Sequence, residues 1–234
     1  MRMSSLSGLV AVVTGTAHGI GASIADLLQD HQAHVHRIDR EQVDLTDSEL
    51  TSAYLRDIGQ VDILVNSAGG VCGQTHSPIE EVTDEAWDAV INANLRTARN
   101  VVRAVAPGMK ERGFGRIVTI SSGAGRSVSL TGIQAYTSAK AGLIGFTRQM
   151  AWELGPFGIT VNCIAPGFVL SNPTTIQQWE GYGPDGQAAL VNGIATRRIG
   201  QPEDIARGCL FFVEPSAGWV SGQTLSIDGG HSLF

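Results

Sequence analysis

The chain has 234 residues, of which 43% are hydrophobic and 16% charged, and its net charge is −6. This length suffices for one large hydrophobic core and is short for two full domains. Nucleic acids and anionic membranes bind clustered Lys and Arg, so the acidic balance predicts neither as a partner. The apolar run at residues 9–14 is too short for a signal segment, and no run approaches a membrane span in length, which predicts a cytoplasmic protein.

Short apolar runs alternate along the chain with longer segments of helical periodicity. Strands are expected at residues 9–14, 34–39, 61–69, 115–121, 158–167 and 223–230. Helices are expected at residues 19–31, 83–112, 135–155 and 202–213. Continuous apolar strands separated by amphipathic helices predict a parallel sheet covered on both faces. We therefore expect a single domain over residues 1–234 with a doubly wound, Rossmann-like α/β fold, whose ligand crevice lies at the carboxyl ends of the strands.

The segment after the second expected strand is unusually short. Only a few residues separate Asp39 from the VDLTD segment at 43–47. Because a full crossover helix needs a dozen or more residues, the helix after strand two is expected to be shortened or missing. The sheet should then have a reduced edge on that side.

The sequence TGTAHGIG at residues 14–21 lies between the first strand and the first helix. Gly15 would permit a sharp turn, Gly19 the close approach of backbone to a phosphate, and Gly21 tight packing of helix on strand. The helix N-terminus offers free N–H groups and a positive dipole end to a pyrophosphate, although a tight turn without a ligand is the alternative. The loop residues His18 and Ile20 are counted with the cofactor contacts, and a spacer role is the simpler interpretation for His18.

Asp39 ends the second strand. A carboxylate at this position can accept both ribose hydroxyls of an adenosine and would repel a 2′-phosphate, which favours NAD over NADP. The alternative is an ordinary strand-end Asp. Arg37 and Arg40 lie nearby and could serve a 2′-phosphate, so NADP stays open.

Tyr136 and Lys140 are spaced four residues apart near the start of an expected helix, so their side chains share one face. Such a pair is often only a helix surface. Here the sequence SSGAG at 121–125 directly follows a strand, at the end where the crevice lies. An ammonium beside a phenol lowers the phenol pKa, and a Ser hydroxyl can polarise a carbonyl oxygen. Ser122, Tyr136 and Lys140 therefore predict chemistry on an alcohol or a ketone.

Three cysteines, Cys72, Cys163 and Cys209, lack the spacing of metal ligands. We interpret them as reduced, small apolar residues, and no metal site is expected.

In several ordered motifs the sequence resembles the short-chain dehydrogenase/reductase family, in its single-domain form and over essentially the whole chain. The motifs are TGxxxGIG (14–21), NSAG (66–69) as a variant of NNAG, INANL (91–95), the strand-end serine, YxxxK (136–140), PG (166–167) and DGG (228–230).

The resemblance implies catalytic roles for four residues. Tyr136 would be the general acid/base, and Lys140 would lower its pKa and bind the nicotinamide ribose. Ser122 would bind the substrate oxygen, chosen over Ser121 because the family uses the second serine. Asn94 would hold a water that connects Lys140 to solvent.

The resemblance also implies further cofactor contacts. The adenine and ribose side would be formed by Asp44, Leu45, Asn66, Ala68 and Gly69, and the nicotinamide side by Pro166, Gly167, Val169 and Ser171, where Ser171 replaces the family's usual Thr. A homotetramer is implied as well, built through the helices 94–112 and 136–155 and the last strand.

Residues 172–198 resemble the family's variable substrate lid, which we expect to close on binding. Trp179 is a candidate substrate contact, with packing of the lid onto the body as the alternative, and Gln134 is another candidate. These features predict a small-molecule substrate such as a sugar, polyol, hydroxy acid or small alcohol, without identifying it.

Two other functions are compatible with parts of the sequence. A 3-oxoacyl-(acyl-carrier) reductase should present basic residues to its acidic carrier, whereas the turn at 155–158 reads GPFG. A dinucleotide-sensing regulator is conceivable because fold does not fix function. The complete set of Asn94, Ser122, Tyr136 and Lys140 argues against the regulator.

Overall fold

The computed structural model describes residues 6–129 and 131–233, which form a six-stranded, all-parallel sheet. The strand order is β2-β1-β3-β4-β5-β6, so the chain winds outward from β1 in both directions. This confirms the predicted doubly wound sheet. The strands are β1 (Val10–Thr14), β2 (His34–Ile38), β3 (Ile63–Asn66), β4 (Gly115–Ile120), β5 (Ile159–Pro166) and β6 (Thr224–Ile227).

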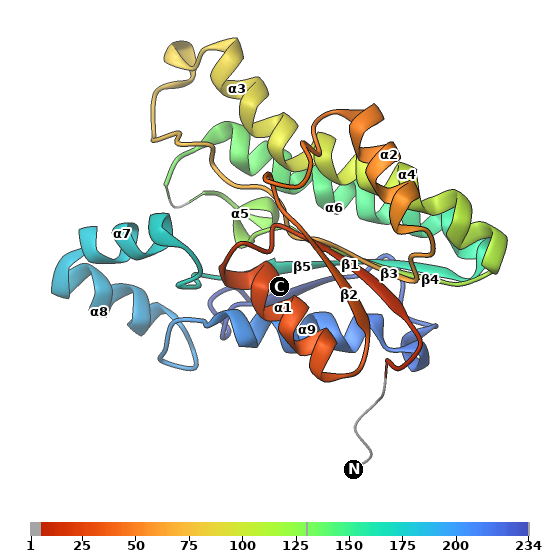
Figure 1. Ribbon diagram of the computed structural model, residues 1–234. Coiled ribbons are helices and arrows are strands. Elements are labelled where there is room, and N and C mark those ends of the chain that lie inside the picture. Colours follow the sequence, from red (N-terminus) through yellow and green to blue (C-terminus); the bar gives the residue numbers. More distant parts are fainter. Residues whose placement is uncertain (1–5, 130, 234) are drawn as a thin grey trace.

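Helices cover both faces of the sheet (Figure 1). One face carries α1 (Gly19–Asp30) and α9 (Pro202–Val213), and the other carries α2 (Ser48–Ile58), α4 (Thr97–Arg112) and α6 (Gln134–Leu154). Along β1, Val13 belongs to the α1 and α9 core whereas Val12 belongs to the opposite core. Alternate residues of a strand point to opposite faces, so strands covered on both faces are apolar throughout, as the sequence indicated.

The segment directly after β2 contains no helix, and α2 alone makes the crossover to β3. Residues 39–47, all of them described, contain neither helix nor strand. Asn100 on α4 donates hydrogen bonds to the carbonyl oxygens of Leu45 and Thr46, at 2.9 and 3.0 Å. Asp47 then caps α2 by accepting from the N–H groups of Glu49 and Leu50. The short segment is therefore held directly against α4.

The long helix expected at 83–112 is interrupted. The structure divides it into α3 (Asp84–Ile91), a turn of π-helix η2 (Asn92–Arg96) and α4. Such π-turns insert one residue into a helix and frequently occur at functional sites. The insertion lies at Asn94, one of the predicted catalytic residues.

The remaining elements are short. The expected lid contains two helices, α7 (Pro173–Gly181) and α8 (Gly183–Gly193), which lie to one side of the main body (Figure 1). No helix among the described residues is both long and apolar enough to cross a membrane. The other segments are η1 (Ile79–Glu81), α5 (Gly123–Arg126), η3 (Gly155–Phe157) and η4 (Pro215–Ala217).

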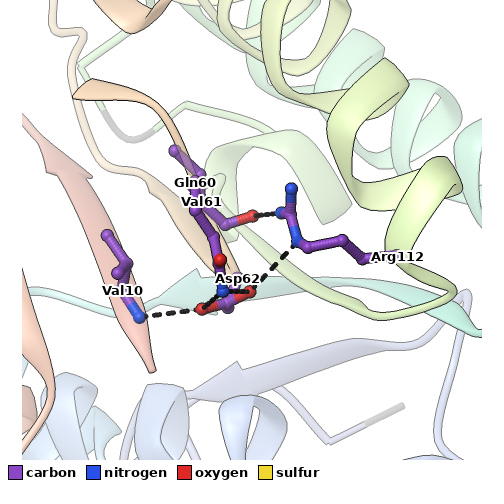
Figure 2. A network of polar contacts seen from close by, with 5 residues as sticks. All are labelled: Val10, Gln60, Val61, Asp62 and Arg112. Carbon is purple, nitrogen blue, oxygen red and sulfur yellow. Dashed lines mark hydrogen bonds and ion pairs between the residues drawn. The ribbon is translucent and has the colours of Figure 1, made fainter. Parts of the chain in front are cut away.

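A polar network closes the amino end of the sheet (Figure 2). Asp62, directly before β3, accepts hydrogen bonds from the Val10 N–H at 2.9 Å and from the Gln60 amide. The Arg112 guanidinium lies 3.5 Å from the Asp62 carboxylate and donates to the Val61 carbonyl. This network ties β1, β3 and α4 together at the end of the sheet opposite the crevice.

Candidate active site

The glycine-rich loop packs closely against two other segments predicted to bind the cofactor. Gly15 has a φ of +72°, and a Cβ there would lie 2.8 Å from the Ala68 Cα. Gly19 has a φ of +63°, and a Cβ there would lie 1.9 Å from the Ser171 carbonyl oxygen. A Cβ on Gly21 would collide with the Gly15 carbonyl at 2.1 Å. The loop therefore forms a backbone cradle at the N-terminus of α1, which suits the pyrophosphate of a dinucleotide.

Thr14, which the sequence analysis did not single out, joins this loop to the end of β3. Its hydroxyl accepts hydrogen bonds from the N–H groups of Ser67 and Ala68, at 3.1 and 3.0 Å. The signal available in the sequence was the Thr directly before the first glycine of the loop. Thr14 thereby holds the NSAG segment beside the cradle.

Asp39 lies beside the same loop. Its carboxylate accepts from the Ala17 N–H and from the Arg40 N–H, both at 2.8 Å. Arg37 points toward α1, where its guanidinium pairs with Asp26 at 2.6 Å. The crevice edge at the end of β2 therefore presents a carboxylate, while Arg37 is engaged elsewhere.

The other predicted cofactor residues differ in their hydrogen bonds, their packing and their burial. The Asp44 carboxylate accepts from the side chain and backbone of Thr46, and these bonds lower the pKa of Asp44. On the nicotinamide side, Gly167 packs so closely that a Cβ would lie 2.6 Å from the Asp228 Cβ. Burial varies across the set: Leu45, Asn66, Pro166 and Val169 are buried, Ile20 is half-buried in the first turn of α1, and His18 is exposed.

The first two turns of α6 and the end of β4 bring the predicted catalytic side chains together. The Lys140 ammonium lies 5.5 Å from the centroid of the Tyr136 ring and donates to the Ile120 carbonyl at 2.9 Å. Ser122 caps α5, and its hydroxyl hydrogen-bonds Tyr136. Ser121 has a different role, because its buried hydroxyl donates to the Lys140 carbonyl at 2.7 Å. Ser122, Tyr136 and Lys140 thus meet at the carboxyl end of β4.

Asn94 on η2 fixes the loop that follows β3. Its side-chain amide donates to the carbonyls of Gly70 and Val90, both at 2.8 Å, and its Oδ1 accepts from the Gly70 N–H. Gly69 passes so close that a Cβ would lie 2.4 Å from the same Oδ1. Gly70, a second residue that the sequence analysis missed, is signalled by the glycine pair after NSA.

Burial shifts both titratable groups of the site toward their neutral forms. Loss of hydration raises the pKa of the Tyr136 phenol, and the hydrogen bond from Ser122 opposes this rise. Burial lowers the pKa of Lys140 to about 8. Desolvation of the phenolate is the largest effect on the pKa of Tyr136, and the lowering of that pKa by Lys140 stays a prediction.

The two candidate substrate contacts are engaged within the protein. Gln134 donates to the Ser77 carbonyl at 2.7 Å, which ties the loop before α6 to the loop after β3. Trp179 packs on Phe168, with ring centroids 6.1 Å apart, and Tyr182 packs on the same ring at 5.9 Å. Phe168 therefore anchors the lid to the end of β5, which is the packing arrangement weighed for Trp179.

Among the described residues, no group of three or more His, Cys, Asp and Glu is arranged to hold a metal ion. Three arginines that could have met an anionic substrate are bonded within the chain. Arg126 donates to Ser226 at 2.8 Å, Arg197 to the Asn192 carbonyl, and Arg198 to the carboxylate of Asp204.

Comparison with known proteins places this geometry in a family. Residues 42–232 match a family model described as enoyl-(acyl carrier protein) reductase. The 3-oxoacyl-[acyl-carrier-protein] reductase FabG of Vibrio harveyi is 33% identical, with 97% of this chain and 98% of that protein aligned. A (2S)-[(R)-hydroxy(phenyl)methyl]succinyl-CoA dehydrogenase subunit, BbsD of Thauera aromatica, is 35% identical, with 96% and 97% aligned.

Solved structures agree with these relatives. A candidate NAD(P)-dependent gluconate 5-dehydrogenase from Beutenbergia cavernae, with bound NADP, superposes with a TM-score of 0.88 and is 32% identical over 97% of this chain and 98% of that one. A candidate gluconate dehydrogenase from Agrobacterium tumefaciens gives 0.87 at 28% identity, covering 98% of each chain. The chain therefore belongs to the short-chain dehydrogenase/reductase family and is an NAD(P)-dependent oxidoreductase of alcohol and carbonyl groups.

Proposed function

We propose that the protein interconverts a secondary alcohol and a ketone, with Tyr136 as the general acid/base and NAD as the preferred cofactor. The observation that carries this proposal is the meeting of Ser122, Tyr136 and Lys140 at the carboxyl end of β4. The glycine loop at the N-terminus of α1 fits the pyrophosphate of a dinucleotide, because Gly15 and Gly19 let its backbone pack closely on Ala68 and Ser171.

The mechanism assigns one task to each side chain. The nicotinamide, when bound, supplies or accepts the hydride at the substrate carbon. Ser122 holds the substrate oxygen by its hydroxyl, and Tyr136 donates its phenolic proton to that oxygen during reduction. Lys140 would return a proton to the phenolate and bind the ribose hydroxyls, and Asn94 would hold a water that connects Lys140 to solvent. In oxidation the same proton moves the other way.

The preference for NAD rests on Asp39. Its carboxylate is held by the Ala17 N–H beside the cradle, and a 2′-phosphate placed there would be repelled. A structural relative contains NADP, so the preference needs a direct measurement. We expect the ratio of kcat/KM for NAD to that for NADP to exceed one and to fall at least about tenfold in Asp39→Ser. An unchanged ratio would remove Asp39 from the proposal.

For the substrate, we propose a neutral or singly charged molecule such as a sugar, polyol, hydroxy acid or small alcohol. Arg126, Arg197 and Arg198 are bonded within the chain, which supports a substrate that needs no strong cation. The lid helices α7 and α8 lie to one side of the main body, and their closure over the site would exclude water.

A 3-oxoacyl-(acyl-carrier) reductase is the second candidate, favoured by curated relatives that bear that name. The turn expected to lack a basic residue does have one beside it, because the Lys110 ammonium lies 4.9 Å from the Phe157 ring centroid. Lys110 is also 3.8 Å from Glu153, so its charge is partly balanced. One partly balanced cation is a weak docking surface for an acidic carrier.

A direct assay separates the candidates. Purified protein is supplied with gluconate, polyols, small secondary alcohols and a 3-oxoacyl thioester, each with both cofactors, and nicotinamide absorbance is followed. Turnover of the thioester alone would favour the carrier reductase. Tyr136→Phe should abolish whichever turnover is found while leaving cofactor binding intact. Cofactor binding without any turnover would instead indicate a dinucleotide-sensing regulator.

We also propose a cytoplasmic homotetramer. Large apolar side chains are exposed where the family's assembly surfaces would lie: Trp152 on α6 and Leu225 on β6. Sedimentation velocity should give a mass near four times that of the 24.7 kDa chain. Trp152→Glu should reduce that mass, whereas Ile79→Glu, at another exposed apolar residue on η1, should not.

A further inference from the structure

A row of polar side chains crosses the sheet directly beneath the catalytic helix. The sheet register places Asn66 beside Thr119, Thr119 beside Cys163, and Cys163 beside Thr224. Neighbouring strands in a sheet lie about 4.8 Å apart, so each side chain is adjacent to the next. Leu64, Ile117 and Val161, each two residues earlier on its strand, pack in the core that α4 and α6 cover. The polar row therefore faces α6.

Helix α6 presents two polar side chains to this row. Lys140 and Thr147 are both buried and are separated by two helical turns, so they lie on one face. Both lie near the Cys163 thiol: the Lys140 charge acts on it, and Thr147 neighbours its sulfur without a hydrogen bond of normal geometry. Tyr136 on the same helix is the other titratable group that faces Lys140. Cys163 thus lies between Lys140 and Thr147 at the interface of helix and sheet.

Several polar atoms of this interface lack partners. Among the described residues, the hydroxyls of Thr119, Thr147 and Thr224 and both amide atoms of Asn66 are buried and accept or donate no hydrogen bond within the protein. Burying such groups unsatisfied costs free energy, and folded proteins satisfy them with ordered water that bonds several polar groups at once. Lys140 has three N–H donors, of which the Ile120 carbonyl accepts one.

We propose that Thr119, Cys163 and Thr147 hold ordered water against the buried side of Lys140, and that this water hydrates the ammonium group and keeps it charged and in place. Thr119 and Thr147 are then positioning residues that act through Lys140. Hydration from behind opposes the effect of burial, which disfavours the charged form of a lysine. This inference rests on the proposed function only for the importance of Lys140, and the water site itself can be tested without a substrate.

The chain is well suited to the test because Lys110 and Lys140 are its two lysines. Protein labelled with ¹³C at lysine Cε is titrated from about pH 6 to about pH 11, and Lys110→Arg assigns the signals. Thr119→Val and Thr147→Val keep the side-chain shape and remove the hydroxyl. We expect each variant to lower the pKa of Lys140 by about one unit relative to wild type, and the double variant to lower it further.

Thr160→Val is the matched control. Thr160 is also a buried threonine without a partner for its hydroxyl, but it lies between Ile159 and Val161 on β5 and so faces the opposite side of the sheet from α6. The pKa of Lys140 should stay at its wild-type value in Thr160→Val. Thr119→Ser and Thr147→Ser, which retain the hydroxyl, should also preserve it and so exclude a packing effect.

Two results would overturn the proposal. One is a pKa of Lys140 that is unchanged in both valine variants, and the other is an equal fall in Thr160→Val. If Thr119→Val does not fold, Thr147→Val and the two serine variants decide the matter. Because the titration uses no substrate, a negative result here leaves the proposed reaction intact, and a failed assay for turnover leaves the water site intact.

Discussion

At the scale of a single residue, two opposing effects act on the pKa of Tyr136. Loss of hydration raises the pKa of its phenol, and the Ser122 hydroxyl lowers it by hydrogen bonding to the phenolate. Removing the hydroxyl in Ser122→Ala should therefore raise the pKa of Tyr136, by about half a unit to one unit. The chain has three tyrosines, so ¹³Cζ-tyrosine spectra can follow Tyr136 directly, with Tyr136→Phe as the assignment. Ser129→Ala should leave the titration unchanged, and a fall in Ser122→Ala would contradict the hydrogen bond.

The buried ammonium of Lys140 lowers the free energy of unfolding, although the proposed reaction needs this group. Its pKa is lowered to about 8 in the folded chain, so burial destabilises the protein in full at pH values below 8, where both states hold the proton. Between pH 8 and the ordinary value of 10.5 the unfolded chain holds more protons, and the free energy of unfolding rises with pH.

Lys140→Met should remove this cost together with the hydrogen bond to Ile120. We expect the free energy of unfolding to rise by about 2 kcal/mol at about pH 7. This gain should shrink as the pH approaches the pKa of an exposed lysine. Turnover should be lost. Urea unfolding at two pH values and one protein concentration measures both the gain and its decline. Equal or lower stability at neutral pH would show that the buried ammonium is compensated.

The sequence predicted that the candidate catalytic residues lie together because their spacing is local. Tyr136 and Lys140 share a helix, and Ser122 directly follows a strand, so pattern alone brings all three to one place. Gln134 and Trp179 are different. Whether each faces a substrate or a neighbouring loop depends on contacts with Ser77 and Phe168, which only the folded chain reveals.

At the scale of elements, the tightest constraint joins the loop after β3 to the π-turn η2. Gly69 and Gly70 both have positive φ, +143° and +154°, but a Cβ on Gly69 would lie 2.4 Å from the Asn94 Oδ1 and one on Gly70 would meet nothing within 4 Å. Alanine at either position would introduce the same kind of backbone strain. The difference between them isolates the collision with Asn94.

We therefore expect Gly69→Ala to lower the free energy of unfolding by roughly 1–3 kcal/mol more than Gly70→Ala does. It should also lower kcat more, because the displaced Asn94 would no longer hold its water in line with Lys140. Urea unfolding and steady-state kinetics on the two variants provide the comparison. Equal losses in the two variants would mean that Asn94 moves aside without consequence.

Some secondary-structure elements could be predicted from the sequence and others could not. All six strands were predicted from the sequence, and the short distance between Asp39 and residue 43 indicated the stretch without helix at 39–47. Helix α2 was not expected, because its sequence SELTSAYLRDI holds few apolar residues and packs them on one side only. The π-turn was invisible for another reason: one inserted residue shifts the helical period without interrupting the apolar pattern.

At the scale of the whole molecule, stability and activity are concentrated at opposite ends of the sheet. The crevice lies at the carboxyl ends of the strands, whereas the network around Asp62 closes the amino ends (Figure 2). The Asp62 side chain is 4% exposed and satisfies a backbone N–H of β1, the Gln60 amide and the Arg112 guanidinium together. Removing it would leave all three without their acceptor.

Asp62→Ala should therefore lower the free energy of unfolding by about 2–4 kcal/mol, because it leaves the Val10 N–H and the partly buried Arg112 guanidinium without their acceptor. KM and kcat of the folded fraction should stay near wild type, since the substituted site is a full strand length away from Lys140. Asp57→Asn on the exposed side of α2 is the control and should change stability by less than about 0.5 kcal/mol. Urea unfolding combined with kinetics tests both halves of the expectation. A loss of kcat at full folding would show that the two ends of the sheet are coupled, and stability equal to the control would show that the network contributes nothing to the fold.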